Sequence, residues 1–223
     1  IMRNLISFAK QGNILVDEVE GDYDESRFGK PVLMLNGKPL TKGAPFSYHA
    51  ESTVFMSEDG NSVIKKSHAI GADSSNTTIA DRLHNMALFN EMFPDTPLEL
   101  IGIRDAGNGN CELILRQNRI RGTELARLKN PKTGNLYLIS ERNKMLDKFM
   151  EEVYGLTTSE NDVYSNGIYD VDDVRYNHDN VIVDENGRMF VIDGFVRNAK
   201  NDYLGEILSS DVDFVDRFDE NES

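Results

Sequence analysis

Apolar residues recur at helical spacing in two long stretches of the chain. In residues 77–92, Ile79, Leu83 and Met86 follow one another at three- or four-residue steps, and the pattern stops before Pro94. Residues 139–154 repeat it with Met145, Leu146, Phe149 and Val153. We therefore expect two amphipathic helices over these ranges, and a shorter one over residues 5–10.

Four pairs of apolar or β-branched runs are each separated by an Asn-Gly or Asp-Gly dipeptide, which favours a tight turn. The dipeptides are Asn36-Gly37, Asp59-Gly60, Asn108-Gly109 and Asn186-Gly187. Four β-hairpins are expected, together with a strand near residues 13–19. The polar residues 116–122 are interpreted as a linker, and residues 156–176, rich in Asp, Ser, Asn and Tyr, as an irregular loop. This order predicts an α+β chain.

Composition narrows the classes of partner. The 223 residues contain 24 Lys and Arg against 38 Asp and Glu, a net charge of −14, which disfavours binding to nucleic acid or to an anionic membrane surface. The single cysteine, Cys111, lies in an alternating run and is expected to be a buried strand residue. No run approaches the length of a membrane helix and no signal peptide is evident. A cytoplasmic location is expected.

The hairpin over residues 181–192 carries the most specific chemistry. Asn180 precedes its first strand and Asp193 follows its second, so both side chains are expected at the same end of the ribbon. Their hard oxygen atoms are ligands of the kind that Mg²⁺ takes when it also holds substrate phosphates. A surface hairpin with an Asn cap and a turn Asp is the alternative.

Several motifs resemble those of protein kinases. Ser62-Val63-Ile64-Lys65 resembles the Val-Ala-Ile-Lys strand, Asn180 the catalytic-loop Asn, and Asp193-Gly194-Phe195 the Asp-Phe-Gly motif with its last two residues exchanged. Residues 88–102 and 180–193 look most like the small kinase-like domains of phage and mobile-element polyvalent proteins.

That resemblance implies a minimal two-lobe kinase-like fold, with a β-rich N-lobe carrying one helix and a reduced C-lobe. The implied division has an irregular, mostly β extension over residues 1–44, an N-lobe over 45–116, a C-lobe over 117–205 and an acidic tail over 206–223. It also implies ATP and Mg²⁺ as cofactors. Lys65 would contact the phosphates, and Asn180 and Asp193 would hold the metal. Lys66 is the neighbouring alternative, but it is expected on the opposite face of its strand.

The catalytic base is harder to place. The position five residues before Asn180, where kinases have Asp, is occupied by Arg175. Asp173 would serve as the base if the loop carries two extra residues. His178 is interpreted as a surface loop residue, and Asp179 as pointing away or capping the strand.

The resemblance to kinases also implies the remaining cofactor contacts, which are assigned by their place in the chain. Ser47 and Ser52 would supply hydroxyl contacts in place of a glycine-rich loop, because the segment between residues 43 and 52 has one glycine. The linker would offer the backbone groups of Gln117, Asn118 and Arg119 to an adenine edge. Asp81 or Glu91, both in the first long helix, would pair with Lys65.

Three functions compete at this point. The first is a minimal ATP-dependent kinase acting on a hydroxyl of a protein or small molecule, with Asp173 and Lys65 as its catalytic residues. The second is a pseudokinase, or nucleotide-binding module, whose role is interaction with a protein partner. The third, a calcium-binding or scaffold domain suggested by Asp170, Asp172 and Asp173, is weakest because these residues lack the ligand pattern of a calcium loop.

Overall fold

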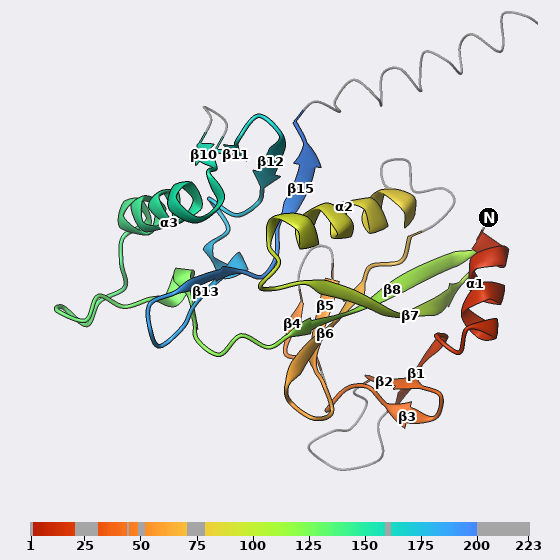
Figure 1. Ribbon diagram of the computed structural model, residues 1–223. Coiled ribbons are helices and arrows are strands. Elements are labelled where there is room, and N and C mark those ends of the chain that lie inside the picture. Colours follow the sequence, from red (N-terminus) through yellow and green to blue (C-terminus); the bar gives the residue numbers. More distant parts are fainter. Residues whose placement is uncertain are drawn as a thin grey trace, which may run out of the picture. The chain divides into compact units, whose positions relative to one another are not determined.

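The computed structural model describes residues 2–20, 31–43, 45–48, 52–70, 79–158 and 162–199 (Figure 1). The chain divides into two compact units, residues 1–120 and 121–223. Both combine helices and antiparallel strands, so the expected α+β class is confirmed. The lobe boundary expected after residue 116 falls inside β8 (Asn110–Asn118), the last strand of the first unit. The expected acidic tail lies outside the described residues.

The first unit is built around a five-stranded antiparallel sheet with the order β4-β5-β6-β8-β7. Its other strands are β4 (Ser47–Tyr48), β5 (Ser52–Met56), β6 (Ser62–Ser67) and β7 (Leu98–Gly107). The hairpins expected around Asp59-Gly60 and Asn108-Gly109 are confirmed. Asn108 and Gly109 both have positive φ, 53° and 82°, as a tight two-residue hairpin turn requires.

The N-terminal segment forms α1 (Met2–Gln11) and a three-stranded sheet of β1 (Val16–Glu20), β2 (Pro31–Leu35) and β3 (Lys38–Pro39). The predicted short helix is thus confirmed and extends further in both directions. The buried side chains of Val16 and Leu33 share one core cluster with Phe55, Ile64 and Ile114 of the larger sheet. The extension is therefore part of the hydrophobic core of the first unit.

The same segment also lies along an edge strand of the larger sheet. β7 is an edge strand, and the N–H of Ile103 donates to the carbonyl of Ile14 across 2.9 Å. Gly102 allows this close approach, because a Cβ there would lie 2.3 Å from Cγ2 of Val16. Residues 14–16 thus satisfy backbone groups that an open edge would leave available for aggregation.

Two helices contribute to a second core cluster of this unit. Ile79 and Leu83 of α2 (Ile79–Met92), with Ile6 and Ala9 of α1, pack with Ile103, Cys111 and Leu113 of the sheet. The predicted helix is confirmed from Ile79 onward, and residues 77–78 lie outside the described residues. Cys111 is 1 % exposed, so the prediction of a buried strand cysteine is also confirmed.

The second unit contains α3 (Ile139–Tyr154), which has the expected limits. One sheet joins β14 (Met189–Val191), β13 (Val181–Val183) and β9 (Thr123–Glu124). The other joins β10 (Thr157–Thr158), β11 (Tyr164–Ser165), β12 (Tyr169–Asp172) and β15 (Phe195–Asn198). Two short 3-10 helices, η1 (Leu125–Arg127) and η2 (His178–Asn180), complete the unit. Among the described residues, no helix is both long and apolar enough to cross a membrane.

Two expectations about irregular segments were wrong. The described residues between 156 and 176 form three strands, and the last of them, β12, pairs with β15 and places Val171 opposite the buried Val196. Strands of two residues carry no alternation, so tertiary pairing decides their conformation. The expected linker over residues 116–122 begins inside β8, which continues to Asn118.

Candidate nucleotide and metal site

In the first unit, the strand register places the expected phosphate-contacting residues on one face of the large sheet. Ser47 pairs with Val54, Val54 with Lys65, and Lys65 with Leu115. Directly opposed residues project to the same face of an antiparallel sheet. Leu115 packs against the cluster that includes α2, so this row of side chains lies on the α2 face.

Ser52 belongs to the same face, because it lies two positions before Val54 along β5. Strands are about 4.8 Å apart, which separates the backbones of Ser47 and Lys65 by about 10 Å. Lys65 is only 7 % exposed. The sheet thus brings a buried ammonium group and two hydroxyl side chains to one surface. Asp81 and Glu91 both lie on α2 and are exposed, and the choice between them as partner of Lys65 stays a prediction.

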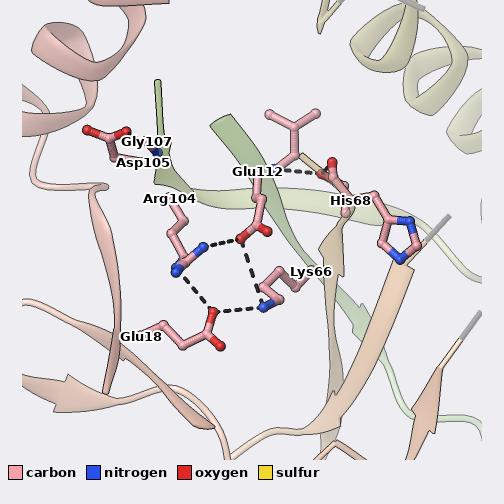
Figure 2. A network of polar contacts seen from close by, with 9 residues as sticks. Glu18, Lys66, His68, Arg104, Asp105, Gly107 and Glu112 are labelled. Atoms are coloured by element: carbon pink, nitrogen blue, oxygen red, sulfur yellow. Dashed lines mark hydrogen bonds and ion pairs between the residues drawn. The ribbon is translucent and has the colours of Figure 1, made fainter. Parts of the chain in front are cut away.

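Lys66 lies on the opposite face, as predicted, within a charge network drawn in Figure 2. Its Nζ lies 2.7 Å from an oxygen of Glu18 in β1 and 3.9 Å from one of Glu112 in β8. Arg104 of β7 contacts the same two carboxylates at 3.1 and 2.7 Å. Lys66 therefore holds the N-terminal segment to the sheet and has a structural role.

Gln117, the first of the three expected adenine contacts, is enclosed in the sheet. Its backbone lies in register between Val63 of β6 and Leu98 of β7. Its buried side chain donates from Nε2 to the carbonyl of Thr96 across 2.7 Å. These contacts tie the end of β8 to the residues that precede β7.

Asn118 presents its backbone differently. The N–H of Arg119 donates to the carbonyl of Asn61 across 3.0 Å. The adjoining pair of Ser62 and Asn118 is therefore of the non-hydrogen-bonded type. The N–H and C=O of Asn118 consequently point away from β6, on the side where β7 begins.

In the second unit, Asn180 lies beside Asp173. Asn180 is 4 % exposed, and its Nδ2 donates to the carbonyl oxygen of Asp173 across 2.8 Å, with Oδ2 of the same residue at 3.5 Å. Because Nδ2 faces Asp173, the amide oxygen Oδ1 is directed elsewhere. The structure therefore brings together the expected metal-binding amide and the expected base.

Asp193 approaches the same segment through the hairpin of β13 and β14. The N–H of Ile192 donates to the carbonyl of Asn180 across 2.8 Å, so the two ends of the ribbon meet as expected. A Cβ on the next residue, Gly194, would lie 2.8 Å from Cγ2 of Val174 and 3.5 Å from the carbonyl oxygen of Asp172. Glycine is required at this close approach, which sets Asp193 next to residues 172–174.

Arg175 is engaged in an ion-pair cluster that fixes the loop to α3. Its Nε and Nη2 contact the two carboxylate oxygens of Asp147 at 2.9 and 3.1 Å, and it also pairs with Asp162. Tyr164 donates its hydroxyl to Asp147 across 2.7 Å. Burial would raise the pKa of Asp147, but these hydrogen bonds outweigh it and lower that pKa. The contact with Asp147 raises the pKa of Arg175, so its guanidinium stays charged and does not accept a proton.

The interpretation of His178 as a surface residue was wrong. Its side chain is buried, and its Nε2 lies 2.7 Å from Oδ1 of Asn143 on α3. No local pattern predicts this contact, because Asn143 and His178 are 35 positions apart. Together with Arg175, His178 connects the segment that carries Asp173 and Asn180 to α3.

The sequence of residues 38–200 matches the family model of a serine/threonine/tyrosine kinase found in polyvalent proteins, over more than half of the chain. The chain belongs to this kinase family. The resemblance expected from the motifs is thereby confirmed. The kinase match begins at β3, so α1, β1 and β2 precede it. A search of curated proteins gave no match.

Proposed function

We propose that the chain is an ATP- and Mg²⁺-dependent kinase that transfers phosphate to a hydroxyl of a protein or small molecule. The observation that carries the proposal is the contact between Asn180 and Asp173, in a chain of a kinase family. It supports a loop with two extra residues, in which Asp173 takes the place of the base. We also propose that the protein is cytoplasmic.

The residues of each unit fit the groups that the reaction needs. Asn180 offers its amide oxygen, and Asp193 a carboxylate whose Oδ1 accepts the N–H of Gly194 across 3.0 Å. Mg²⁺ commonly takes one or two protein oxygens and completes its shell with phosphates and water. When bound, it would offset charge on the phosphate oxygens.

In the first unit, Lys65 would contact the phosphates from the α2 face, with Ser47 and Ser52 as hydroxyl donors. The backbone of Asn118 would meet the adenine edge, because its N–H and C=O point away from β6. Gln117 and Arg119 would then support the end of β8 by the contacts described above.

In the proposed step, the acceptor hydroxyl gives its proton to a carboxylate oxygen of Asp173 while its oxygen bonds to the γ-phosphorus. The bond from that phosphorus to the oxygen bridging the β-phosphate breaks, and its electron pair leaves with ADP. Asp173 holds the acceptor oxygen in line, and the positive charge of Lys65 stabilises the phosphate oxygens.

A nucleotide-binding pseudokinase is the second candidate. Arg175 occupies the usual position of the base, and its ion pairs with Asp147 and Asp162 exclude it from proton transfer. If Asp173 does not act as the base, nucleotide binding without turnover remains.

Thermal-shift and ATP-turnover assays with Mg²⁺ and a panel of protein and small-molecule hydroxyl acceptors test the proposal. The wild type should be stabilised by nucleotide, by about 2.7 kcal/mol at 100 times the dissociation constant, and should turn over ATP. Asp193→Ala should lose Mg²⁺-dependent stabilisation. Asp173→Asn should bind nucleotide but lose turnover, since Asn also tolerates positive φ. Stabilisation without turnover in the wild type would favour the pseudokinase, and no stabilisation by any nucleotide would exclude both functions.

A further inference from the structure

Asp173 has an unusual backbone conformation. Its φ is 62°, in the left-handed region that residues with a side chain rarely adopt. Such a conformation persists where neighbouring groups hold it, and it is common at functional sites. The contacts around Asp173 show which groups do so.

Asp172 holds the amide of Asp173 with a single carboxylate oxygen. Its Oδ1 accepts the N–H of Asp173 across 2.7 Å and the hydroxyl of Tyr176 across 2.7 Å. The backbone of Asp172 is fixed in turn, because it pairs with Phe195 at the end of β12. Tyr176 therefore closes a short loop around the residue that would act as base.

Tyr176 is 62 % exposed, so packing does not explain its placement. Its hydrogen bond to Asp172 raises the pKa of the phenol, which keeps the hydroxyl protonated as a donor. On the other side, Asn180 donates to the carbonyl oxygen and, at longer distance, to the carboxylate of Asp173. The backbone of Asp173 is thus held at both its N–H and its C=O.

We propose that Asp172 and Tyr176 are positioning residues that hold Asp173 in its left-handed conformation and keep its carboxylate beside Asn180. The effect on phosphoryl transfer rests on the proposed function, whereas the effect on the backbone does not. Neither residue is assigned a contact with the nucleotide. Their loss should therefore lower kcat and leave the dissociation constant of Mg·ATP unchanged.

Three variants separate the contacts. Tyr176→Phe removes only the hydroxyl, Asp172→Ala removes the acceptor for both donors, and Asp172→Asn keeps an acceptor oxygen without the charge. Tyr137→Phe is the matched control, since it removes one hydroxyl from a tyrosine elsewhere in the same unit. Far-ultraviolet circular dichroism verifies that each variant is folded.

The first measurement is the hydrogen exchange of the Asp173 amide by NMR, which requires no activity. Loss of one hydrogen bond corresponds to a change of about tenfold, so Asp172→Ala should accelerate exchange about tenfold or more. Tyr176→Phe should accelerate it by a smaller factor, and Asp172→Asn should stay near the wild type. Equal exchange in wild type, Asp172→Ala and Tyr176→Phe would overturn the proposal whatever their activity.

The second measurement is kcat together with the Mg·ATP dissociation constant. Asp172→Ala should lower kcat about tenfold, Tyr176→Phe should lower it by a smaller factor, and Asp172→Asn should retain most of it. Unchanged kcat in the first two variants would also overturn the proposal. If exchange responds but the wild type turns over no ATP, the positioning role stands and the proposed kinase activity fails.

Discussion

Lys66 of β6 donates a hydrogen bond from Nζ to Oε2 of Glu18 in β1 across 2.7 Å, joining residues 48 positions apart. The Lys66 and Glu18 side chains are 15 and 18 % exposed, and Arg104 and Glu112 complete the network. The N-terminal sheet is therefore attached to the large sheet by charge as well as by apolar packing.

Glu18→Gln should lower the free energy of unfolding by about 1–2 kcal/mol, between the values of exposed and buried ion pairs. The change leaves Lys66 and Arg104 with one shared carboxylate. The matched control is Glu99→Gln, whose pair with Arg116 is exposed and should cost less than about 0.5 kcal/mol. Urea unfolding followed by circular dichroism measures both, and equal losses would contradict the structural role of the network.

Lys65→Met and Lys66→Met separate the two faces of β6. Lys65→Met should abolish most of the thermal stabilisation by Mg·ATP, because the ammonium on the α2 face is the proposed phosphate contact. Lys66→Met should bind nucleotide as the wild type does, while its melting temperature without nucleotide falls. The opposite pattern would remove Lys65 from the proposed site.

Arg175→Lys should lower the free energy of unfolding of the second unit by about 1.5–3 kcal/mol, since lysine cannot make the two-pronged contact with Asp147. Arg127→Lys is the control, because its pair with Glu124 is largely exposed. Hydrogen exchange of amides in α3 and β12 measures the change within this unit. A loss no larger than that of the control would show that the cluster adds little stability.

Acid should destabilise the second unit through His178. Burial lowers the pKa of His178 below its ordinary value of 6.5, so the folded state binds fewer protons than the unfolded state. The contribution of His178 to the free energy of unfolding is fully present above about pH 6.5, and it is lost as the pH falls through the pKa of His178 in the folded state.

The test of this pH dependence compares unfolding at pH 7.5 and pH 5. His178→Gln should reduce the difference in the free energy of unfolding between these two pH values. A reduction of about 1.4 kcal/mol is expected for each pH unit by which folding lowers the pKa of His178. His84→Gln, at an exposed histidine in the first unit, is the control. Identical pH dependence of wild type and His178→Gln would rule out this contribution.

Local chemistry explains which features the sequence predicted. Asn108-Gly109 favours a tight turn whatever surrounds it, and the ribbon from Asn180 to Asp193 brings its ends together by strand geometry alone. Lys65 could be assigned to the face opposite Lys66 because strand side chains alternate. These predictions required only neighbouring residues.

The features that the sequence did not predict depend on distant partners. The strands between residues 157 and 172 form because β15 supplies a partner, and His178 is buried because α3 supplies Asn143. Tyr176 belongs to no motif, and its contact with Asp172 accompanies the left-handed turn at Asp173. Composition and periodicity carry no signal for such contacts.

The N-terminal segment has a practical consequence for work on the kinase domain. Val16 and Leu33 belong to the same apolar cluster as Ile64, the residue next to Lys65. A shortened chain that starts at residue 38, where the family match begins, would expose Phe55, Ile64 and Ile114 to water. The hydrophobic core of the first unit thus includes residues that lie before the part of the chain that matches the kinase family.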